Sequence, residues 1–250
     1  MNRPISRREL LRNAGLTAAA CALPFPLNAC ESEEVPREPL SKLVPPEQVA
    51  DPDRARLTAW ANTLRAERMK QPSLGRGATR VGELAVGTPY QPFTLEEYLR
   101  SGGSPLSTEP LALSLTRFDC VTLVESCLAV ARVADAPSAP SWGGFAREVE
   151  RMRYRGGERR EFASRLHYFS EWISDGENRG LLRDLGSELG GVVDARPLRF
   201  MTEHRKSYLA LADDAVYREI GAMQRRLDDN PRRVVPRERI AQVSDSIETG

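Results

Sequence analysis

Cys120 is the side chain in this sequence whose type and setting best suit nucleophilic chemistry. It directly follows Asp119, a residue type that often caps helices, and it opens an apolar segment that runs to about Val133. At the first turn of a helix, unpaired backbone N–H groups and the positive helix end favour a thiolate and so lower the pKa of a cysteine. This position predicts a reactive thiol, although a small buried side chain is the plainer alternative for any cysteine.

Cys127 lies seven positions further along the same predicted helix. Seven residues rise roughly 10 Å along a helix, which exceeds the Cα separation that a disulfide can close. We therefore expect Cys120 and Cys127 to remain unpaired thiols. The apolar neighbours of Cys127 favour a buried, structural role for it.

The sequence contains two histidines that could serve such a thiol as general base, His167 and His204. Spacing alone is a poor guide to a site, so a structural hydrogen bond, or a place beside the substrate with Arg165, is the favoured interpretation of His167. Its role as base is the fallback. His204 is expected to be a solvated residue at a helix start. The two histidines with Cys120 and Cys127 match no zinc-binding spacing, so no metal site is predicted.

The elements expected to position these residues are mostly helices. Capping residues, prolines and apolar periodicity predict helices over residues 53–70, 77–86, 120–133, 142–153 and 213–227. They also predict a turn at 87–89, a loop at 135–141, a strand over 111–115 and an extended segment over 192–201. The helix over 120–133 is apolar on several sides, Val124 included, so we expect it to be buried.

The composition excludes two broad classes of protein. Thirty-six basic and 35 acidic residues give a formal charge of +1, which leaves no basic surplus for binding nucleic acid. No apolar run approaches the roughly 18 residues that a membrane span requires. A hydrophobic fraction of 40% and a length of 250 residues fit one good-sized globular domain or two small ones.

The N-terminal segment is predicted to direct export. Paired Arg7 and Arg8 precede a short apolar stretch, as in twin-arginine signals, and Leu27–Cys30 is similar to a lipobox. Residues 1–29 are therefore predicted to be an export signal, with Cys30 as the lipid-anchored first residue of a protein in the cell envelope. A plain cleavage site at Ala20–Ala22 is the alternative. Residues 30–52, rich in proline and acidic residues, are expected to form a flexible tether to a domain over 53–250.

Several motifs downstream of Val81 resemble a known bacterial family. They are Gly87-Thr88-Pro89-Tyr90, Thr94-Leu95-Glu96, Phe118 to Glu125, Arg153-Tyr154-Arg155 with Gly157, Ser164 to Ile173, Phe200-Met201-Thr202 and Val235-Pro236. Together they resemble the N-acetylmuramoyl-L-alanine amidase-like family, within the NlpC group of papain-like cysteine hydrolases. Each motif alone is weak, and the set is specific.

This resemblance implies a fold, a reaction and site residues. The fold would be α+β and helix-rich, of the NlpC or papain-like type. Cys120 resembles the nucleophile, and Tyr90 resembles the tyrosine beside the oxyanion. The implied reaction cleaves the amide between N-acetylmuramic acid and L-alanine in peptidoglycan or its muropeptide fragments, with no cofactor. Arg165 and Asp119 are expected to contact this substrate.

The sequence departs from the family pattern at its C-terminal end. In the family, the catalytic histidine follows a strand that would begin near Ile247–Gly250. We therefore expect the C-terminal sheet strands to be missing from this chain, apolar surface to be exposed and amidase activity to be low or absent. A non-catalytic lipoprotein that binds peptidoglycan is the alternative function.

Overall fold

Helices form most of the structure, which is a computed structural model that describes residues 51–67, 73–243 and 247. These residues belong to one unit, Leu40–Gly250. The longer helices are α2 (Asp51–Glu67), α3 (Leu74–Leu84), α5 (Cys120–Asp135), α6 (Trp142–Arg153), α7 (Phe169–Asn178) and α9 (Asp214–Arg226). The shorter elements are α4 (Glu97–Arg100), α8 (Phe200–Glu203) and α10 (Ile240–Val243), with strands β1 (Val192–Asp194) and β2 (Arg232–Val234).

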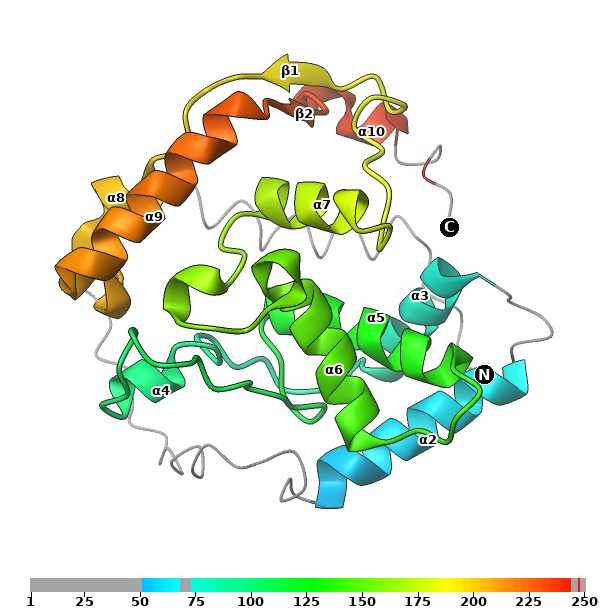
Figure 1. Cartoon of the computed structure of the whole chain (residues 1–250). Helices are drawn as coiled ribbons and strands as arrows, with labels where there is room; N and C mark the ends of the chain where they lie inside the picture. The colour runs from blue at the N-terminus through cyan, green and yellow to red at the C-terminus, as the bar shows by residue number, and fades with distance from the viewer. Residues whose placement is uncertain (1–50, 68–72, 244–246, 248–250) are drawn as a thin grey trace. The chain divides into compact units, whose positions relative to one another are not determined.

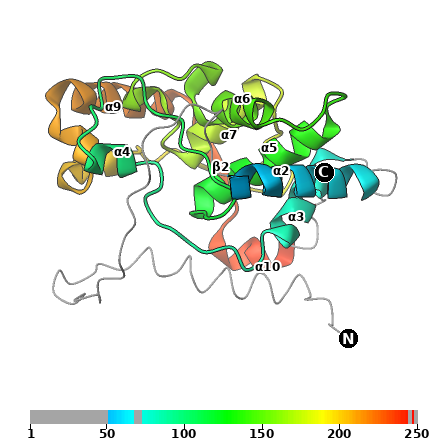
Figure 2. The ribbon, with the colours of Figure 1, turned by 90° about the horizontal axis from the view of Figure 1, so that it is seen from below.

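Helix α5 lies at the centre of the larger hydrophobic core. It packs against α2, α3 and α6, and Figures 1 and 2 show these four helices side by side. Their buried apolar side chains include Leu57, Val81, Val130 and Phe145, each 1% exposed or less. Burial of this many large side chains is the main source of stability for a fold that is mostly helical.

A second apolar cluster forms around α9. Val216, Ile220 and Met223 follow one another at helical spacing on its buried face. They pack with Phe162 and Met201. The predicted amphipathic helix over 213–227 is thus confirmed, with Asp213 as the N-cap whose carboxylate accepts bonds from the first backbone N–H groups.

The sheet is small. β1 and β2 pair antiparallel, with Val192 opposite Val234 and Asp194 opposite Arg232. Only the start of the predicted extended segment 192–201 is a strand, because its last residues form the short helix α8. The expectation of a helix-rich fold with some β structure is confirmed, and the two strands lie in the C-terminal part of the chain.

The predicted strand over 111–115 is wrong, because this segment pairs with no other strand among the described residues. Side chains from distant helices satisfy its backbone groups instead. Asp53 Oδ1 accepts from the Leu115 N–H at 2.6 Å, and Arg56 donates to the Leu115 carbonyl at 2.8 Å. Arg153 donates to the Ala112 carbonyl at 2.7 Å. The backbone hydrogen-bonding groups of an extended segment can therefore find partners outside a β-sheet.

The other predicted elements agree with the structure to within a few residues. The helices over 142–153 and 120–133 are α6 and α5, and those over 53–70 and 77–86 are α2 and α3, which both begin earlier than predicted, while residues 68–70 lie outside the described residues. α5 is buried along most of its length, but Val124 is 42% exposed, contrary to the prediction. Residues 1–50, which include the predicted export signal, Cys30 and most of the tether, lie outside the described residues.

Candidate active site

Cys120 is the first residue of α5, and its side chain is exposed. Asp119 caps the helix in an extended conformation, and its Oδ1 accepts from the N–H groups of Val121 at 3.0 Å and Thr122 at 2.8 Å. The Thr122 hydroxyl accepts in return from the Asp119 N–H at 2.9 Å. This reciprocal capping box fixes the backbone on both sides of the thiol.

The second oxygen of the Asp119 carboxylate is also bonded. The Thr94 hydroxyl donates to Asp119 Oδ2 at 2.7 Å. Both carboxylate oxygens therefore serve the local structure, which makes Asp119 a positioning residue for Cys120. The prediction that Asp119 contacts substrate stays a prediction.

Tyr90 lies beside the segment that leads into Cys120. It pairs in parallel with Phe118, because the Gln91 N–H donates to the Phe118 carbonyl at 2.8 Å and the Phe118 N–H donates to the Pro89 carbonyl at 3.2 Å. The turn before it is made by Gly87, whose φ of 88° suits glycine. The Tyr90 side chain is 70% exposed. The structure thus brings Tyr90 and Cys120, 30 positions apart in the sequence, to neighbouring segments.

Arg165 belongs to a buried charged cluster and is only 4% exposed. Its guanidinium contacts Glu96 at 2.7 Å and Glu109 at 3.6 Å. Burial raises the pKa of Glu109, and the nearby Arg165 acts in the opposite direction. The hydroxyls of Tyr154 and Tyr98 donate to the two Glu109 oxygens at 3.1 and 3.4 Å. These contacts give Arg165 a structural role, and its predicted contact with substrate is untested.

His167 is half-buried and held by Phe162. Its Nε2 lies 3.0 Å from the Phe162 carbonyl, and the two rings are 4.5 Å apart. A carbonyl only accepts, so Nε2 carries the proton and the lone pair of the neutral ring is on Nδ1. Burial, with the Arg165 and Arg155 guanidiniums nearby, lowers the pKa of His167 well below 6.5. In the described part of the chain, no hydrogen bond joins His167 to Cys120.

Cys127 and His204 are the remaining residues that the sequence analysis considered. Cys127 is an unpaired buried thiol, as expected, and burial raises its pKa to about 11. His204 ends α8 and also precedes the 3-10 helix Arg205–Ser207 as its N-cap, so it is an exposed residue at a helix start as expected, and its ring stacks on Phe200. Within residues 51–67, 73–243 and 247, no three His, Cys, Asp or Glu side chains cluster as metal ligands would. Among the described helices, none is both long and apolar enough to cross a membrane.

The sequence analysis assigned no role to Thr94, Glu96, Glu109 or Glu125. Thr94 and Glu96 occur in one of the quoted motifs, which was a usable signal. Glu125 also carried a signal, because a glutamate inside an apolar helix needs a buried partner. That partner is Arg153, whose Nη2 lies 2.7 Å from Glu125 Oε2, with both side chains 3% exposed. No local pattern marked Glu109.

Comparison with protein families matches residues 80–250 to the N-acetylmuramoyl-L-alanine amidase-like family. The chain belongs to this family. The match starts just before the Tyr90 turn and includes Thr94, Cys120 and the buried charged cluster. No curated protein matches the chain.

Two solved structures from Bacteroides resemble this chain in fold. An N-acetylmuramoyl-L-alanine amidase from Bacteroides uniformis is 27% identical, with a TM-score of 0.57, and the similarity covers 65% of each chain. A Bacteroides fragilis protein named as a candidate xylanase is 30% identical, with a TM-score of 0.54, covering 64% of this chain and 66% of that one. The chain thus spans about 65% of the length of the amidase.

Proposed function

We propose that this chain is a peptidoglycan hydrolase that cleaves the amide between N-acetylmuramic acid and L-alanine, with Cys120 as nucleophile. The observation that supports this most is the exposed thiol on the capped first turn of α5, in a chain of the amidase-like family. A helix N-terminus stabilises a thiolate, and exposure leaves the sulfur open to a large substrate. An NlpC or papain-like arrangement of the site is part of the proposal.

The reaction proceeds in two steps. The Cys120 thiolate attacks the lactyl carbonyl carbon, forming a C–S bond and an oxyanion, and the C–N bond then breaks as the alanine nitrogen takes a proton and leaves. Water next attacks the thioester, which releases the free lactyl carboxylate and restores the thiol. Tyr90, on the segment paired with Phe118, is proposed to donate its hydroxyl proton in a hydrogen bond to the oxyanion.

Proton transfer in both steps requires a general base. His167 is the described residue to test for this role, and its Nδ1 is the atom that would accept the proton. Its contacts with Phe162 and its lowered pKa fit the structural alternative better, because a weakly basic imidazole is a poor proton acceptor. A His167→Gln variant keeps an N–H donor for Phe162. Activity of that variant equal to the wild type would exclude His167 as base.

The amidase proposal is tested with a purified muropeptide and mass spectrometry. The expected products are the free stem peptide and the N-acetylmuramic acid lactyl carboxylate, both absent with Cys120→Ser. If turnover is slow, a single acyl transfer still adds the muramoyl mass to Cys120. Cys127→Ser is the matched control and should leave product and adduct unchanged. The proposal fails if neither forms, or if Cys120→Ser still yields product.

Thiol labelling tests the nucleophile without any substrate. Iodoacetamide at neutral pH should modify Cys120 at least roughly 100-fold faster than Cys127, because the buried thiol reacts only when the structure opens. Peptide mapping distinguishes the two sites. Equal, slow labelling of both would make Cys120 a structural residue.

We also propose that the protein is exported and anchored by a lipid on Cys30, so that it meets peptidoglycan in the cell envelope. The support is the paired Arg7 and Arg8 and the Leu27–Cys30 motif. The mature protein should begin at Cys30 and sediment with membranes, and Cys30→Ala should release it. An unprocessed N-terminus at Met1 would contradict this proposal.

A further inference from the structure

Phe93 has a backbone conformation that its side chain does not favour. Its φ of 60° is in the left-handed region, and no other non-glycine residue of the described chain has a positive φ. A bulky residue in this region carries steric strain, which glycine or asparagine would reduce. The Phe93 ring is also 56% exposed, so burial does not compensate for the strain. Folding alone therefore gives no reason for phenylalanine here.

The strained turn is held in place next to the candidate active site. The Gln91 N–H bonds to the Phe118 carbonyl, and Thr94, the residue after Phe93, bonds to the carboxylate of Asp119. The Glu96 N–H closes the turn on the Phe93 carbonyl at 3.2 Å. The backbone that carries the ring is thus fixed on the segment that supports the first turn of α5. Strain at a site that its surroundings fix in this way is often functional.

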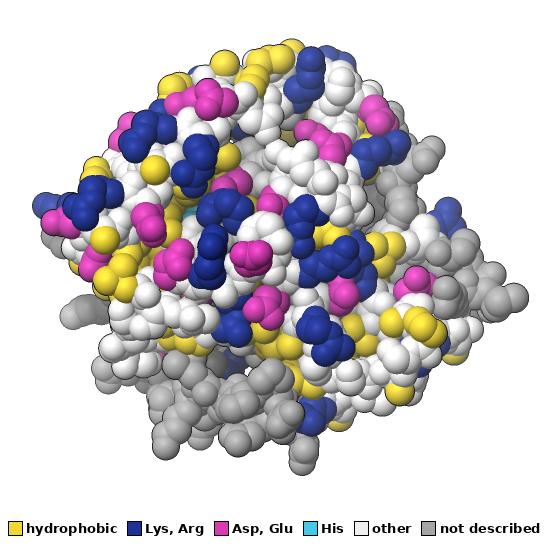
Figure 3. Space-filling model, in the orientation of Figure 1, with side chains coloured by type: hydrophobic (Ala, Val, Ile, Leu, Met, Phe, Trp, Pro, Cys, Tyr) yellow, Lys and Arg dark blue, Asp and Glu magenta, His cyan; other side chains and the backbone are white. Residues whose placement is uncertain are grey.

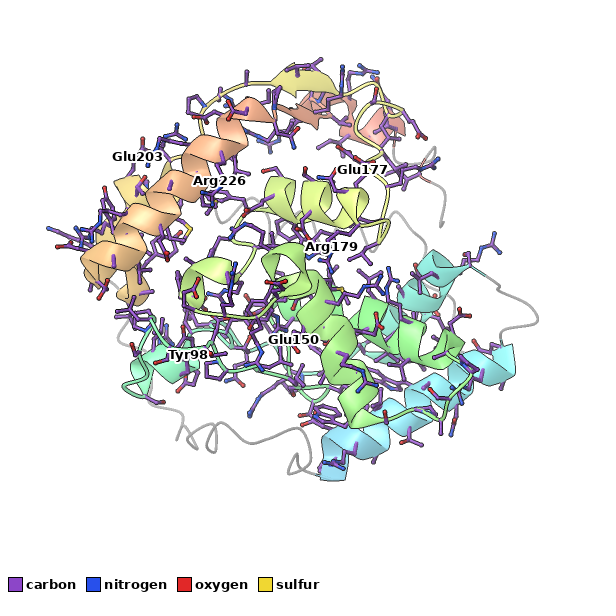
Figure 4. All side chains as sticks on the ribbon, in the orientation of Figure 1. Tyr98, Glu150, Glu177, Arg179, Glu203 and Arg226 are labelled. Carbon is purple, nitrogen blue, oxygen red and sulfur yellow. The ribbon has the colours of Figure 1, made fainter. Side chains whose placement is uncertain are left out.

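Arg100 lies over the exposed Phe93 ring, with its guanidinium carbon 4.4 Å from the ring centroid. Its helix, α4, is anchored by Tyr98 (labelled in Figure 4), which is buried and whose hydroxyl donates to Glu109. Among the described residues, no carboxylate lies within ion-pair distance of Arg100. Many other arginines do pair with carboxylates. Accordingly, basic and acidic side chains are interspersed over the face of the molecule in Figure 3. A guanidinium that rests on an aromatic ring keeps its N–H edge available to bind a planar anion.

We infer that Phe93 and Arg100 form a substrate subsite for a carboxylate of an acidic stem peptide, beside Cys120. The inference rests on the proposed amidase function. The Phe93 ring orients the guanidinium, and Arg100 binds the carboxylate with paired N–H groups, which favours a charged stem over an amidated one. The left-handed backbone at Phe93 is then explained, because this conformation places the ring outward, on the side where the substrate would bind.

Binding to a Cys120→Ala chain tests this subsite without turnover. The ligands are N-acetylmuramoyl-L-alanyl-D-glutamate and the same compound with its stem carboxylates amidated, and titration calorimetry measures both. Arg100→Gln should weaken binding of the acidic ligand about 10-fold and leave the amidated ligand unchanged, as expected for loss of one charge-assisted contact. Arg147→Gln, which removes an exposed arginine from α6, is the matched control and should change neither.

Phe93→Gly distinguishes a binding role from a structural one. Glycine relieves the strained φ, so the melting temperature should stay the same or rise, while the acidic ligand binds several-fold more weakly. Loss of thermal stability together with binding would overturn the inference. So would an Arg100→Gln chain that binds the acidic ligand as tightly as its parent, or a parent that does not bind it.

The two proposals fail separately. Hydrolysis by the wild type with no effect of Arg100→Gln or Phe93→Gly on binding would refute the subsite and leave the amidase proposal standing. Selective binding that depends on Arg100, with no hydrolysis and no acyl adduct on Cys120, would support the subsite and refute the amidase proposal.

Discussion

The start and the middle of α5 differ in the interactions that hold them and in the side chains that they expose. At its start, Cys120 is exposed, Val124 one turn later is 42% exposed, and the backbone of the first turn is fixed by hydrogen bonds to Asp119. Further along, Cys127 is 8% exposed and Glu125 is 2% exposed, within the core. One helix thus presents a reactive end held by polar contacts and a middle held by burial. Changes at one end should affect reactivity, and changes in the middle should affect stability.

Breaking the buried ion pair in the middle of α5 should have the largest effect. Glu125→Ala leaves the guanidinium of Arg153 buried without its partner, which costs about 3–5 kcal/mol of folding free energy. Urea denaturation measures this. Glu83→Ala removes an exposed partner of Arg80 on α3 and should cost less than about 1 kcal/mol. Similar losses for the two variants would show that the buried pair contributes no more than a surface pair.

The buried thiol of Cys127 should make stability fall in alkaline solution. Its pKa rises from 9.0 to about 11 on folding, so the native state holds the proton more tightly than the unfolded state. The stabilisation that the protonated Cys127 thiol contributes is complete below pH 9 and is lost as the pH rises through 11. The total loss is about 2–3 kcal/mol of folding free energy. Tyr98 and Tyr154, whose pKa values burial also raises, add to the loss in the wild type.

Comparison of variants isolates the contribution of Cys127. Denaturation at pH 8 to 11 should give a shallower loss for Cys127→Ala than for the wild type. Val130→Ala deletes buried volume from the same helix but keeps the thiol, so it should be less stable throughout with the wild-type slope. A slope that Cys127→Ala does not change would show that folding does not raise the pKa of Cys127.

Local patterns predicted the helices well and the extended segments poorly. The predicted ranges 142–153 and 213–227 match α6 and α9 to within one residue at each end, and the structure adds Ser141 and Asp213 as their N-caps. The supposed strand over 111–115 has its backbone bonded to Asp53, Arg56 and Arg153 instead. Those side chains come from positions 41 to 62 residues away, so no local pattern records them.

The candidate site was predicted where it depends on neighbours in the sequence. Asp119 before Cys120 is a local signal, and the structure confirms the cap. The Thr94–Asp119 and Glu96–Arg165 contacts join positions 25 and 69 residues apart, which only the folded chain brings together. The left-handed backbone of Phe93 was also not predictable, because phenylalanine rarely adopts it.

Removal of the α5 cap should change both stability and the reactivity of Cys120. Asp119→Ala leaves the N–H groups of Val121 and Thr122 without their acceptor and should cost about 1–2 kcal/mol. The freed first turn should also change the iodoacetamide rate at Cys120. Ser141→Ala removes the cap of α6 at a comparable cost but should leave that rate unchanged. If both variants altered the rate equally, general destabilisation would be the cause.

Replacing Thr94 should have the smallest effect on stability and a selective effect on the reactivity of Cys120 at the start of α5. Thr94→Val keeps the shape of the side chain but removes the donor to Asp119 Oδ2, at a cost of about 0.5–1.5 kcal/mol. The Asp119 carboxylate can then rotate away from the cap, so labelling of Cys120 should change several-fold while labelling of Cys127 does not. Thr58→Val, at an exposed position of α2, is the control and should leave both rates unchanged. A Thr94→Val chain with the wild-type rate at Cys120 would show that the cap holds without Thr94, and the 90–96 segment would then position Tyr90 and Phe93 but not the thiol.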